Sequence, residues 1–403
     1  MNGRESGPRC LVSGHSRHER LSKSNAERYA QEDVSVSEAE MTKVTCCLWR
    51  FWLFGLLVSA VPRLGLAQDS SEYPSLSSVL RIGAPSLTIG ENHREGPALF
   101  GVIKGVAIDG HQHIYVLDAS THNVRRFNSS GQHVATAGRS GRGPGDLAQP
   151  YSIWHDGDET LYVVDLLNGV NVFGTRGSRI QYRGRFAEGR GVMAVCKLNG
   201  QLIAAGYYDK HILHALDADG RIVMSFGSAF RPDTDEVVQK VGNSGSIVLT
   251  CDEPNQRLYV AQAALGKVRS YNADGKVLWE SVLPGFRGSQ VFRDRKGAVV
   301  TLFPKHKTEA ILPLGHDHVV LQAHHKERRM APNATRSPDR ARGVEMDLGV
   351  ITYVISVTNG RVITRQYGGP FLMSRAPGGI EVAAYDDDPF PRVFSLPVSI
   401  VSK

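Results

Sequence analysis

The sequence contains 403 residues, with 47 Lys and Arg against 40 Asp and Glu, and 41% of its residues are apolar. These proportions are ordinary for a globular protein and exclude a disordered or collagen-like chain. The formal charge of +7 is small for this length, and the basic residues are scattered along the chain, so nucleic acid is not an expected partner.

The first 67 residues have the pattern of a targeting sequence preceded by a polar extension. Residues 41–67 carry a short basic region, the apolar run Phe51–Val61, and small residues around a cleavage site after Ala67, which is typical of a secretory signal. The apolar run is too short to span a membrane, and no Cys follows it that would carry a lipid. We expect a secreted or periplasmic protein with a single mature domain at residues 68–403, and we interpret residues 1–40 as an upstream, non-native extension.

The mature chain repeats a pattern of short strands and tight turns. The segments Ile114–Asp118 (IYVLD) and Leu161–Asp165 (LYVVD) match closely, and weaker copies occur at Leu202–Gly206 and Leu258–Gln262. Each copy follows a short apolar strand and a polar turn, and three of them precede a strand that ends in an Asn-Ser-Ser-Gly or Asp-Gly turn. Repeats of about 40 to 55 residues with four antiparallel strands each predict the blades of an all-β propeller.

Two further blades are predicted from the strand pattern alone. The fifth comprises residues 310–314, 318–323, 350–356 and 361–366, and the sixth has three strands at 371–374, 380–385 and 392–396. The missing outer strand of the sixth blade is expected from Ser86–Gly90, which would close the ring and cover two sheet edges. Residues 287–305 then form an extra hairpin, or, in the alternative count, a seventh blade.

The segment Gly141–Leu147 (GRGPGDL), with Pro150 and the LYVVD strand after it, resembles the NHL-repeat six-bladed β-propellers of a secreted bacterial type. Residues 96–100 and 368–371 repeat this motif in part. The resemblance implies six four-stranded blades and a structural role for the Gly-Pro motif as a tight crossover between blades. Similar propellers include amidating lyases with channel histidines and lactonases that hold Ca²⁺ in the channel, so the fold alone does not decide the function.

Cys196 and Cys251 are the two cysteines of the mature chain, and each lies on the inner strand of one of two consecutive predicted blades. In an oxidising compartment such a pair can form a disulfide. A bridge needs Cα atoms within about 7 Å, and neighbouring inner strands are expected to splay apart. Two buried free thiols are therefore the expected state, with a disulfide as the alternative.

The histidines and aspartates of the repeats are candidate metal ligands. His316, His318 and His324 lie at alternate positions near one predicted hairpin and would bind Zn²⁺ if they converged; otherwise they are solvated hairpin ends. A second set follows successive inner strands: Asp109, Asp156, Asp158, Asp252 and Asp317. These carboxylates would either ring a channel mouth that holds Ca²⁺ or serve as ordinary turn residues, which is the expectation, so no cofactor is expected.

The sequence contains no GxSxG motif and no phosphate-binding Gly loop, so neither a triad hydrolase nor a nucleotide-binding site is indicated. We expect a binding or interaction module without assignable catalysis, whose ligand is a polar small molecule, a glycan or a peptide. The alternative is a metal-dependent lyase or lactonase of the propeller-channel type. The candidate binding residues come from loops that meet on one face of a propeller: His122, Tyr207, Tyr208, Asp209, His324, Arg328 and Asp386.

Overall fold

The computed structural model describes most of the predicted mature domain. The described residues are 73–90, 96–187, 191–231, 233–243, 245–329, 344–377, 379, 381–387 and 390–401, with side chains not described for 326–348. The predicted signal peptide, its cleavage site and the upstream extension lie outside these residues. Within the described ranges, no helix has the length and apolar character needed to cross a bilayer.

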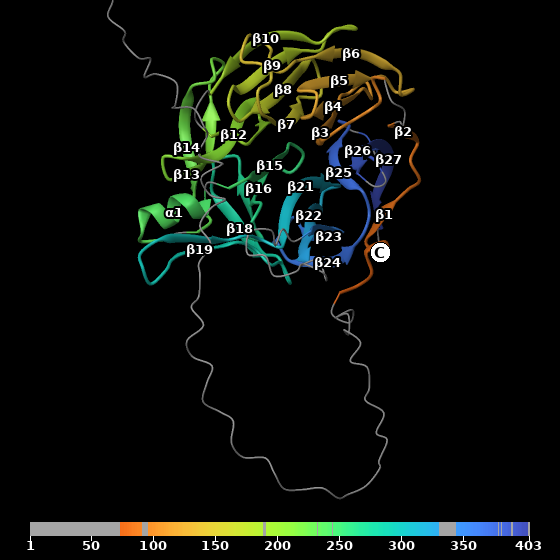
Figure 1. The fold of residues 1–403 in the computed structure, drawn as a ribbon. Helices are drawn as coiled ribbons and strands as arrows, with labels where there is room; N and C mark the ends of the chain where they lie inside the picture. The colour runs from red at the N-terminus through yellow and green to blue at the C-terminus, as the bar shows by residue number, and fades with distance from the viewer. Residues whose placement is uncertain are drawn as a thin grey trace, which may run out of the picture. The chain divides into compact units, whose positions relative to one another are not determined.

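Six four-stranded antiparallel blades form a ring, which Figure 1 shows from one end. Five blades run along the chain from inner to outer strand. Blade 1 contains β3 (Ile103–Ile108), β4 (Ile114–Asp118), β5 (Asn123–Phe127) and β6 (His133–Ala137). Blade 2 contains β7 (Pro150–His155), β8 (Thr160–Asp165), β9 (Gly169–Gly174) and β10 (Gln181–Phe186). Blade 3 contains β11 (Ala194–Leu198), β12 (Gln201–Tyr208), β13 (His211–Leu216) and β14 (Ile222–Ser228).

The second half of the chain completes the ring. Blade 4 contains β15 (Ile247–Asp252), β16 (Arg257–Gln262), β17 (Lys267–Asn272) and β18 (Val277–Val282). Blade 5 contains β21 (His306–Leu314), β22 (His318–Arg329), β23 (Val344–Ser356) and β24 (Val362–Tyr367). Blade 6 contains β25 (Phe371–Arg375), β26 (Glu381–Asp386) and β27 (Arg392–Ile400), and its outer position is filled from the N-terminal segment. Each inner strand contacts the inner strand of the next blade, and β25 contacts β3, so the six-bladed prediction is confirmed.

The ring closes through two N-terminal strands. The predicted segment forms β2 (Leu87–Ile89), which pairs with β27 from Leu87 with Ser395 to Ile89 with Val393. A short 3-10 helix, η1 (Leu76–Ser78), and β1 (Leu80–Ile82) precede it, and β1 pairs with the far end of β27. Closure through the N-terminus is therefore confirmed, and it uses one strand more than the sequence analysis expected.

The apolar core is divided into six clusters, each lying between two adjacent blades in the part of the chain that the structure describes. The Tyr of the second strand illustrates the arrangement, because Tyr115 is fully buried between blades 1 and 2 and Tyr259 between blades 4 and 5. Burial of apolar surface at every junction holds the blades in the ring.

The Asp residues that end the YVxD strands of blades 1 and 2 fasten these blades to the connections that enter them. Asp165 accepts backbone N–H groups from Ala148 and Gln149 on the entering connection and from Leu167 and Asn168 in its own turn. Asp118 makes the equivalent bonds in blade 1. These two carboxylates therefore hold the loops of their blades together.

The Gly-Pro motif at residues 141–147 is also structural. Gly145 has a φ of 77°, a conformation that favours glycine, and the following chain carries Leu147 into the fully buried junction of blades 1 and 2. The Asp146 carboxylate accepts the Gly143 N–H and pairs with Arg139 across the same loop. The motif thus forms the crossover that the resemblance implies.

Cys196 and Cys251 form a disulfide between β11 and β15, so the expectation of two free thiols is wrong. Their Cα atoms are 5.7 Å apart, within the range that a bridge needs. Blades fan outward from the ring axis, and the splay that would separate the cysteines develops mainly in the outer strands. The inner strands β11 and β15 still contact each other directly.

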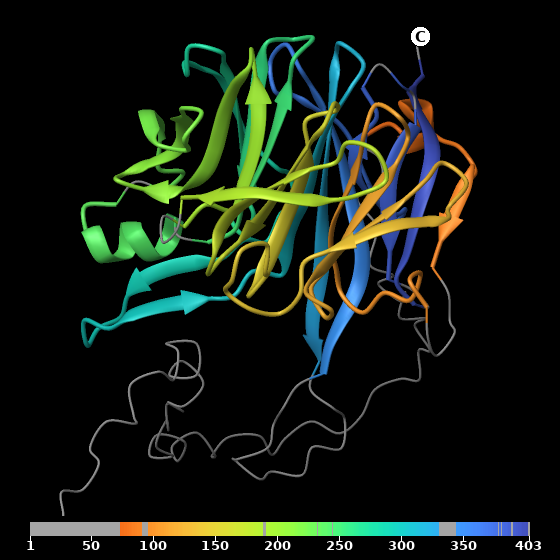
Figure 2. The ribbon, with the colours of Figure 1, turned by 90° about the horizontal axis from the view of Figure 1, so that it is seen from above.

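One end of the ring bears the connections between blades and the turns between the second and third strands of each blade, and we call it the loop face. Two insertions lie at this end. Helix α1 (Glu236–Asn243) lies between blades 3 and 4, and the hairpin of β19 (Gln290–Arg293) and β20 (Val299–Leu302) lies between blades 4 and 5. Figure 2 shows α1, β19 and β20 at the same end of the ring. The hairpin pairs with no other strand among the described residues, so residues 287–305 are an extra hairpin and not a seventh blade.

Candidate functional site

Four of the six inner strands contain a β-bulge near the loop face. The pairing register slips at Lys104 in β3, Tyr151 in β7, Glu309 in β21 and Met373 in β25. The pairing of β11 and β15 with their neighbours is regular. A bulge leaves one residue unpaired and redirects its side chain, and such irregularities often lie next to functional sites.

Two of these bulges bring polar groups together across the centre of the ring. Tyr151 belongs to blade 2, whereas Lys307 and Glu309 belong to blade 5, which is three blades away on the opposite side. The charges of Lys307 and Glu309 nevertheless act on the Tyr151 hydroxyl, and Ser246, at the start of blade 4, also influences its pKa. Side chains from opposite blades can interact in this way only by pointing towards the ring axis. We call Tyr151, Ser246, Lys307 and Glu309 the channel-mouth cluster.

The cluster contains a partly enclosed ion pair. The Lys307 Nζ atom lies 2.8 Å from Glu309 Oε1, and the two side chains are 39% and 26% exposed. Burial alone would lower the pKa of Lys307, but the Glu309 carboxylate outweighs it and raises the pKa above its ordinary value. Burial raises the pKa of Tyr151, with Ser246 and Lys307 opposing the effect. At neutral pH the cluster therefore presents one ammonium, one carboxylate and two neutral hydroxyls.

This set of groups suits recognition of a polar ligand. A ligand carboxylate or phosphate would find the Lys307 ammonium and the hydroxyl of Tyr151, while an amine or amide N–H would find the Glu309 carboxylate. Because the ion pair is not fully buried, a ligand can exchange with it without leaving an isolated charge in an apolar interior.

The predicted binding residues of blades 1 and 3 lie on the loop face but are spread around it. His122 is in the turn after β4, and its ring Nδ1 donates to the Leu147 carbonyl oxygen 3.0 Å away, so it supports the neighbouring loop. Tyr207, Tyr208 and Asp209 end β12 and begin its turn. The Tyr207 hydroxyl receives a hydrogen bond from Gln239 of α1, whereas Tyr208 is 44% exposed.

The predicted residues of blades 5 and 6 are also partly engaged in packing. The His324 ring lies against Phe371 of the next blade, with centroids 4.3 Å apart. Asp386 ends β26 and faces Arg392, with an Oδ2 to Nη2 distance of 3.4 Å. The Arg328 side chain lies outside the described residues. The described members of the predicted set are therefore spread over the loop face and do not form one cluster, and the channel-mouth cluster was missed.

The proposed convergence of His316, His318 and His324 does not occur. His318 begins β22, and His324 lies six residues further along it, or about 20 Å away at the rise of an extended strand. His316 precedes β22 in the turn at the end opposite to the loop face. Among the described residues no group of three or more His, Cys, Asp or Glu side chains has an arrangement that could hold a metal ion.

The turn aspartates hydrogen-bond within their own turns. Asp109 accepts N–H groups from His111 and His113, and Asp156 accepts those of Asp158 and Thr160. Asp252 accepts the side chain and backbone N–H of Asn255 in the same manner. The interpretation of these three aspartates as turn residues is confirmed.

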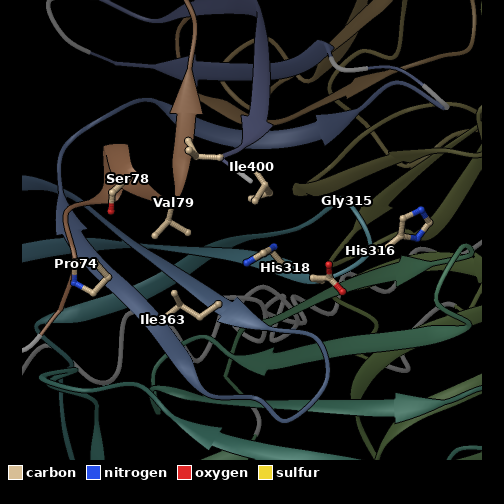
Figure 3. Close-up of a pocket in the computed structure, with 10 residues that line it drawn as sticks. Pro74, Ser78, Val79, Gly315, His316, His318, Ile363 and Ile400 are labelled. Carbon is tan, nitrogen blue, oxygen red and sulfur yellow. The ribbon is translucent and has the colours of Figure 1, made fainter. Parts of the chain in front are cut away.

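A cavity of about 510 Å³ lies away from the channel-mouth cluster, beside the turn that joins β21 to β22. Figure 3 shows its lining of Pro74, Ser78, Val79, Gly315, His316, His318, Ile363 and Ile400. The rings of His316 and His318 lie apart in this view and point to different sides. The rest of the lining is apolar except for Ser78 and Asp317, and it contains no Lys or Arg to match the Asp317 carboxylate as Lys307 matches Glu309.

Comparison with known proteins identifies the fold and nothing finer. No family model matches the sequence, and no curated protein matches it. Among solved structures, a DUF4221 family member from Bacteroides vulgatus superposes with a TM-score of 0.50 at 8% identity, covering 80% of this chain and 99% of that one. A catalytically inactive virginiamycin B lyase from Staphylococcus aureus gives 0.42 at 9% identity, with 79% and 99% coverage, and BamB from Moraxella catarrhalis gives 0.39 at 14%, with 73% and 85%.

Proposed function

We propose that this protein is an exported, NHL-like propeller that binds a small polar ligand, or the polar end of a glycan or peptide, at the channel-mouth cluster. The observation that carries the proposal is the ion pair of Lys307 and Glu309 on the inner strand of blade 5, together with the bulges that redirect Glu309 in blade 5 and Tyr151 in blade 2. Charged side chains at a ring axis contribute little to stability, because an ion pair there loses solvation that its attraction only partly returns. Their placement is better explained by a ligand that uses both charges.

A ligand that carries both an acid and a hydrogen-bond donor fits best. Lys307 would bind the acidic group and Glu309 the donor, with the Tyr151 hydroxyl fixing the orientation between them. Free amino acids, peptide termini and amino sugar acids share this chemistry. The proposal needs no metal, because side chains match both charges of the ligand, and it assigns no catalytic step. Tyr208, which is exposed on the rim, is a candidate contact for the distal part of a longer ligand.

Two observations support export. Residues 41–67 have the order of basic, apolar and small residues expected of a signal peptide. The bridge between Cys196 and Cys251 suits an oxidising compartment, since cytosolic proteins seldom keep structural disulfides. Nucleic acid is not proposed as a partner, because the net charge of +7 is not concentrated on one element.

Binding can be tested by thermal shift and calorimetry with amino acids, dipeptides, amino sugars and their neutral analogues. We expect zwitterionic compounds to stabilise the wild type, and the charge-balanced double variant Lys307→Met with Glu309→Gln to lose that response. Lys276→Met, an exposed Lys next to a turn of blade 4, is the matched control and should bind normally. Ligand binding that persists unchanged in the double variant would place the site elsewhere.

A further inference from the structure

The hairpin of β19 and β20 has two apolar faces, of which only one is covered. Gln290 pairs with Leu302, and Phe292 pairs with Val300, so these four side chains share one face because facing residues in an antiparallel pair project to the same side. The intervening residues, including Val291, project to the other side. We call Phe292, Val300, Leu302 and the adjoining Phe303 the hairpin surface.

The covered face fixes the hairpin on helix α1. Val291 is 5% exposed and lies beside Gly242 of α1. The Arg293 guanidinium pairs with Asp235, whose carboxylate also caps α1 by accepting the N–H groups of Val237 and Val238. The hairpin is therefore held in place, and its outer face does not depend on a flexible attachment.

The uncovered face is unusually apolar. On this face Phe292 is 42% exposed and Leu302 49%, and Phe303, which follows β20 directly, is 88% exposed. A two-stranded sheet with a large apolar face in water is marginal by itself, and contiguous exposed apolar side chains commonly mark interaction sites. The hairpin has no further strand beside it among the described residues, so an additional segment would complete it.

The charge of the hairpin selects among the possible occupants. Residues 287–305 contain five basic side chains and one acidic one, Asp294. A second copy of this chain would place two such basic hairpins against each other, which like-charge repulsion disfavours. The tip of the hairpin is polar, with Arg295 and Lys296 exposed there, while the apolar side chains lie further back along the strands. Insertion of the tip into a membrane would therefore bury charges before it buried the aromatic rings.

We propose that the hairpin surface binds an acidic segment of a partner protein that presents apolar side chains to Phe292, Leu302 and Phe303. The carboxylates of that segment face the basic side chains that border the surface, chiefly Arg295 and Lys296. This interaction is separate from ligand binding at the channel-mouth cluster, since it uses neither Lys307 nor Glu309.

The test uses the whole mature chain and three labelled peptides in fluorescence anisotropy. One peptide alternates Glu with Phe and Leu, the second replaces Glu by Lys, and the third replaces Phe and Leu by Gly. We expect only the first to bind, and we expect a variant with Phe292→Ser, Leu302→Ser and Phe303→Ser to weaken it about tenfold or more. Arg295→Glu combined with Lys296→Glu should weaken it as well.

Two control variants make the result specific. Val223→Ser with Met224→Ser changes side chains on β14 that are 60% and 43% exposed, and it should leave peptide binding unchanged. The double variant of Lys307 and Glu309 should also bind the peptide normally, which separates this proposal from the proposed ligand site. All the substituted side chains are exposed or partly exposed, so unaltered melting temperatures will verify folding.

Three outcomes would overturn the proposal. The first is that the acidic apolar peptide does not bind at millimolar concentration. The second is that this peptide binds the triple variant of Phe292, Leu302 and Phe303 as tightly as it binds the wild type. The third is a hairpin-dependent association of another kind, measured as co-sedimentation with phosphatidylglycerol vesicles or as dimerisation in analytical ultracentrifugation.

Discussion

Removal of the disulfide is expected to destabilise the ring by a calculable amount. Cys196 and Cys251 are separated by 55 residues, and closing a loop of that size restricts the unfolded chain by about 4 kcal/mol in the chain-entropy treatment. The unfolding entropy of a domain of about 330 residues is roughly 0.7 kcal/mol per degree, so the double variant Cys196→Ala with Cys251→Ala should melt about 6 °C lower. The loss of unfolding free energy should be close to the loop-closure contribution alone, because Cys and Ala differ little in volume and the substitutions leave little empty space.

The assay is thermal unfolding with and without reductant. The wild type should lose a similar number of degrees when dithiothreitol is added, whereas the double variant should not respond to it. Mass spectrometry after alkylation of the denatured protein provides an independent measure, with no label incorporated before reduction and two labels afterwards. Two labels without reductant, or equal melting of wild type and variant, would refute both the bridge and the reasoning from loop entropy.

Three further predictions concern the fold. Deletion of the chain through Ile89 removes β1 and β2 and exposes β27, so the protein should aggregate and lose its cooperative melting. A product that is monomeric in size-exclusion chromatography and melts like the mature chain would contradict closure of the ring by these strands. Burial lowers the pKa of His306 to about 4, so its neutral ring contributes stability above pH 6.5 that declines as the pH falls towards 4. The variant His306→Asn keeps an acceptor for the Arg287 N–H but cannot be protonated. The free energy of unfolding in urea should fall between pH 7 and pH 4.5 by about 2 to 3 kcal/mol less in this variant than in the wild type. An equal fall in both proteins would refute the prediction. Asp165→Ala leaves four backbone N–H groups without their acceptor, so it should lower the free energy of unfolding by about 3 kcal/mol or more in the same assay. A negligible change would mean that water replaces the carboxylate and would contradict the prediction.

The parts of the fold that repeat locally could be predicted from sequence. A blade is built from short strands and tight turns whose residue types are fixed by nearby contacts, as in the Tyr and Asp of the YVxD strands. Closure by residues 86–90 was predictable for a similar reason, because a blade with three strands leaves an edge that needs a partner. β1 was not predicted, since three residues give too short a pattern to recognise.

The channel-mouth cluster could not be predicted in the same way. Tyr151 and Glu309 owe their direction to bulges, and a bulge shifts the alternation of a strand by one residue without requiring any particular residue type. The cluster also joins residues more than 150 positions apart, which no local pattern relates. One signal was present: Lys307 and Glu309 are charged residues at alternate positions of an inner strand, where most repeats have apolar residues.

The disulfide and the inner-strand bulges distinguish blades 3 and 4 from the other four blades. The inner strands of blades 3 and 4 keep regular pairing and are tied together by Cys196 and Cys251, and the connections that leave these blades carry α1 and the hairpin surface. Bulges in the inner strand occur instead in blades 1, 2, 5 and 6, and the inner strands of blades 2 and 5 provide Tyr151, Lys307 and Glu309. A covalent tie beneath the insertions limits the movement of the blades on which a partner would dock, while the irregular strands supply the side chains for a ligand. The two proposed sites should therefore respond differently to reduction: partner binding at the hairpin should weaken when the bridge is opened, and ligand binding at Lys307 and Glu309 should change little.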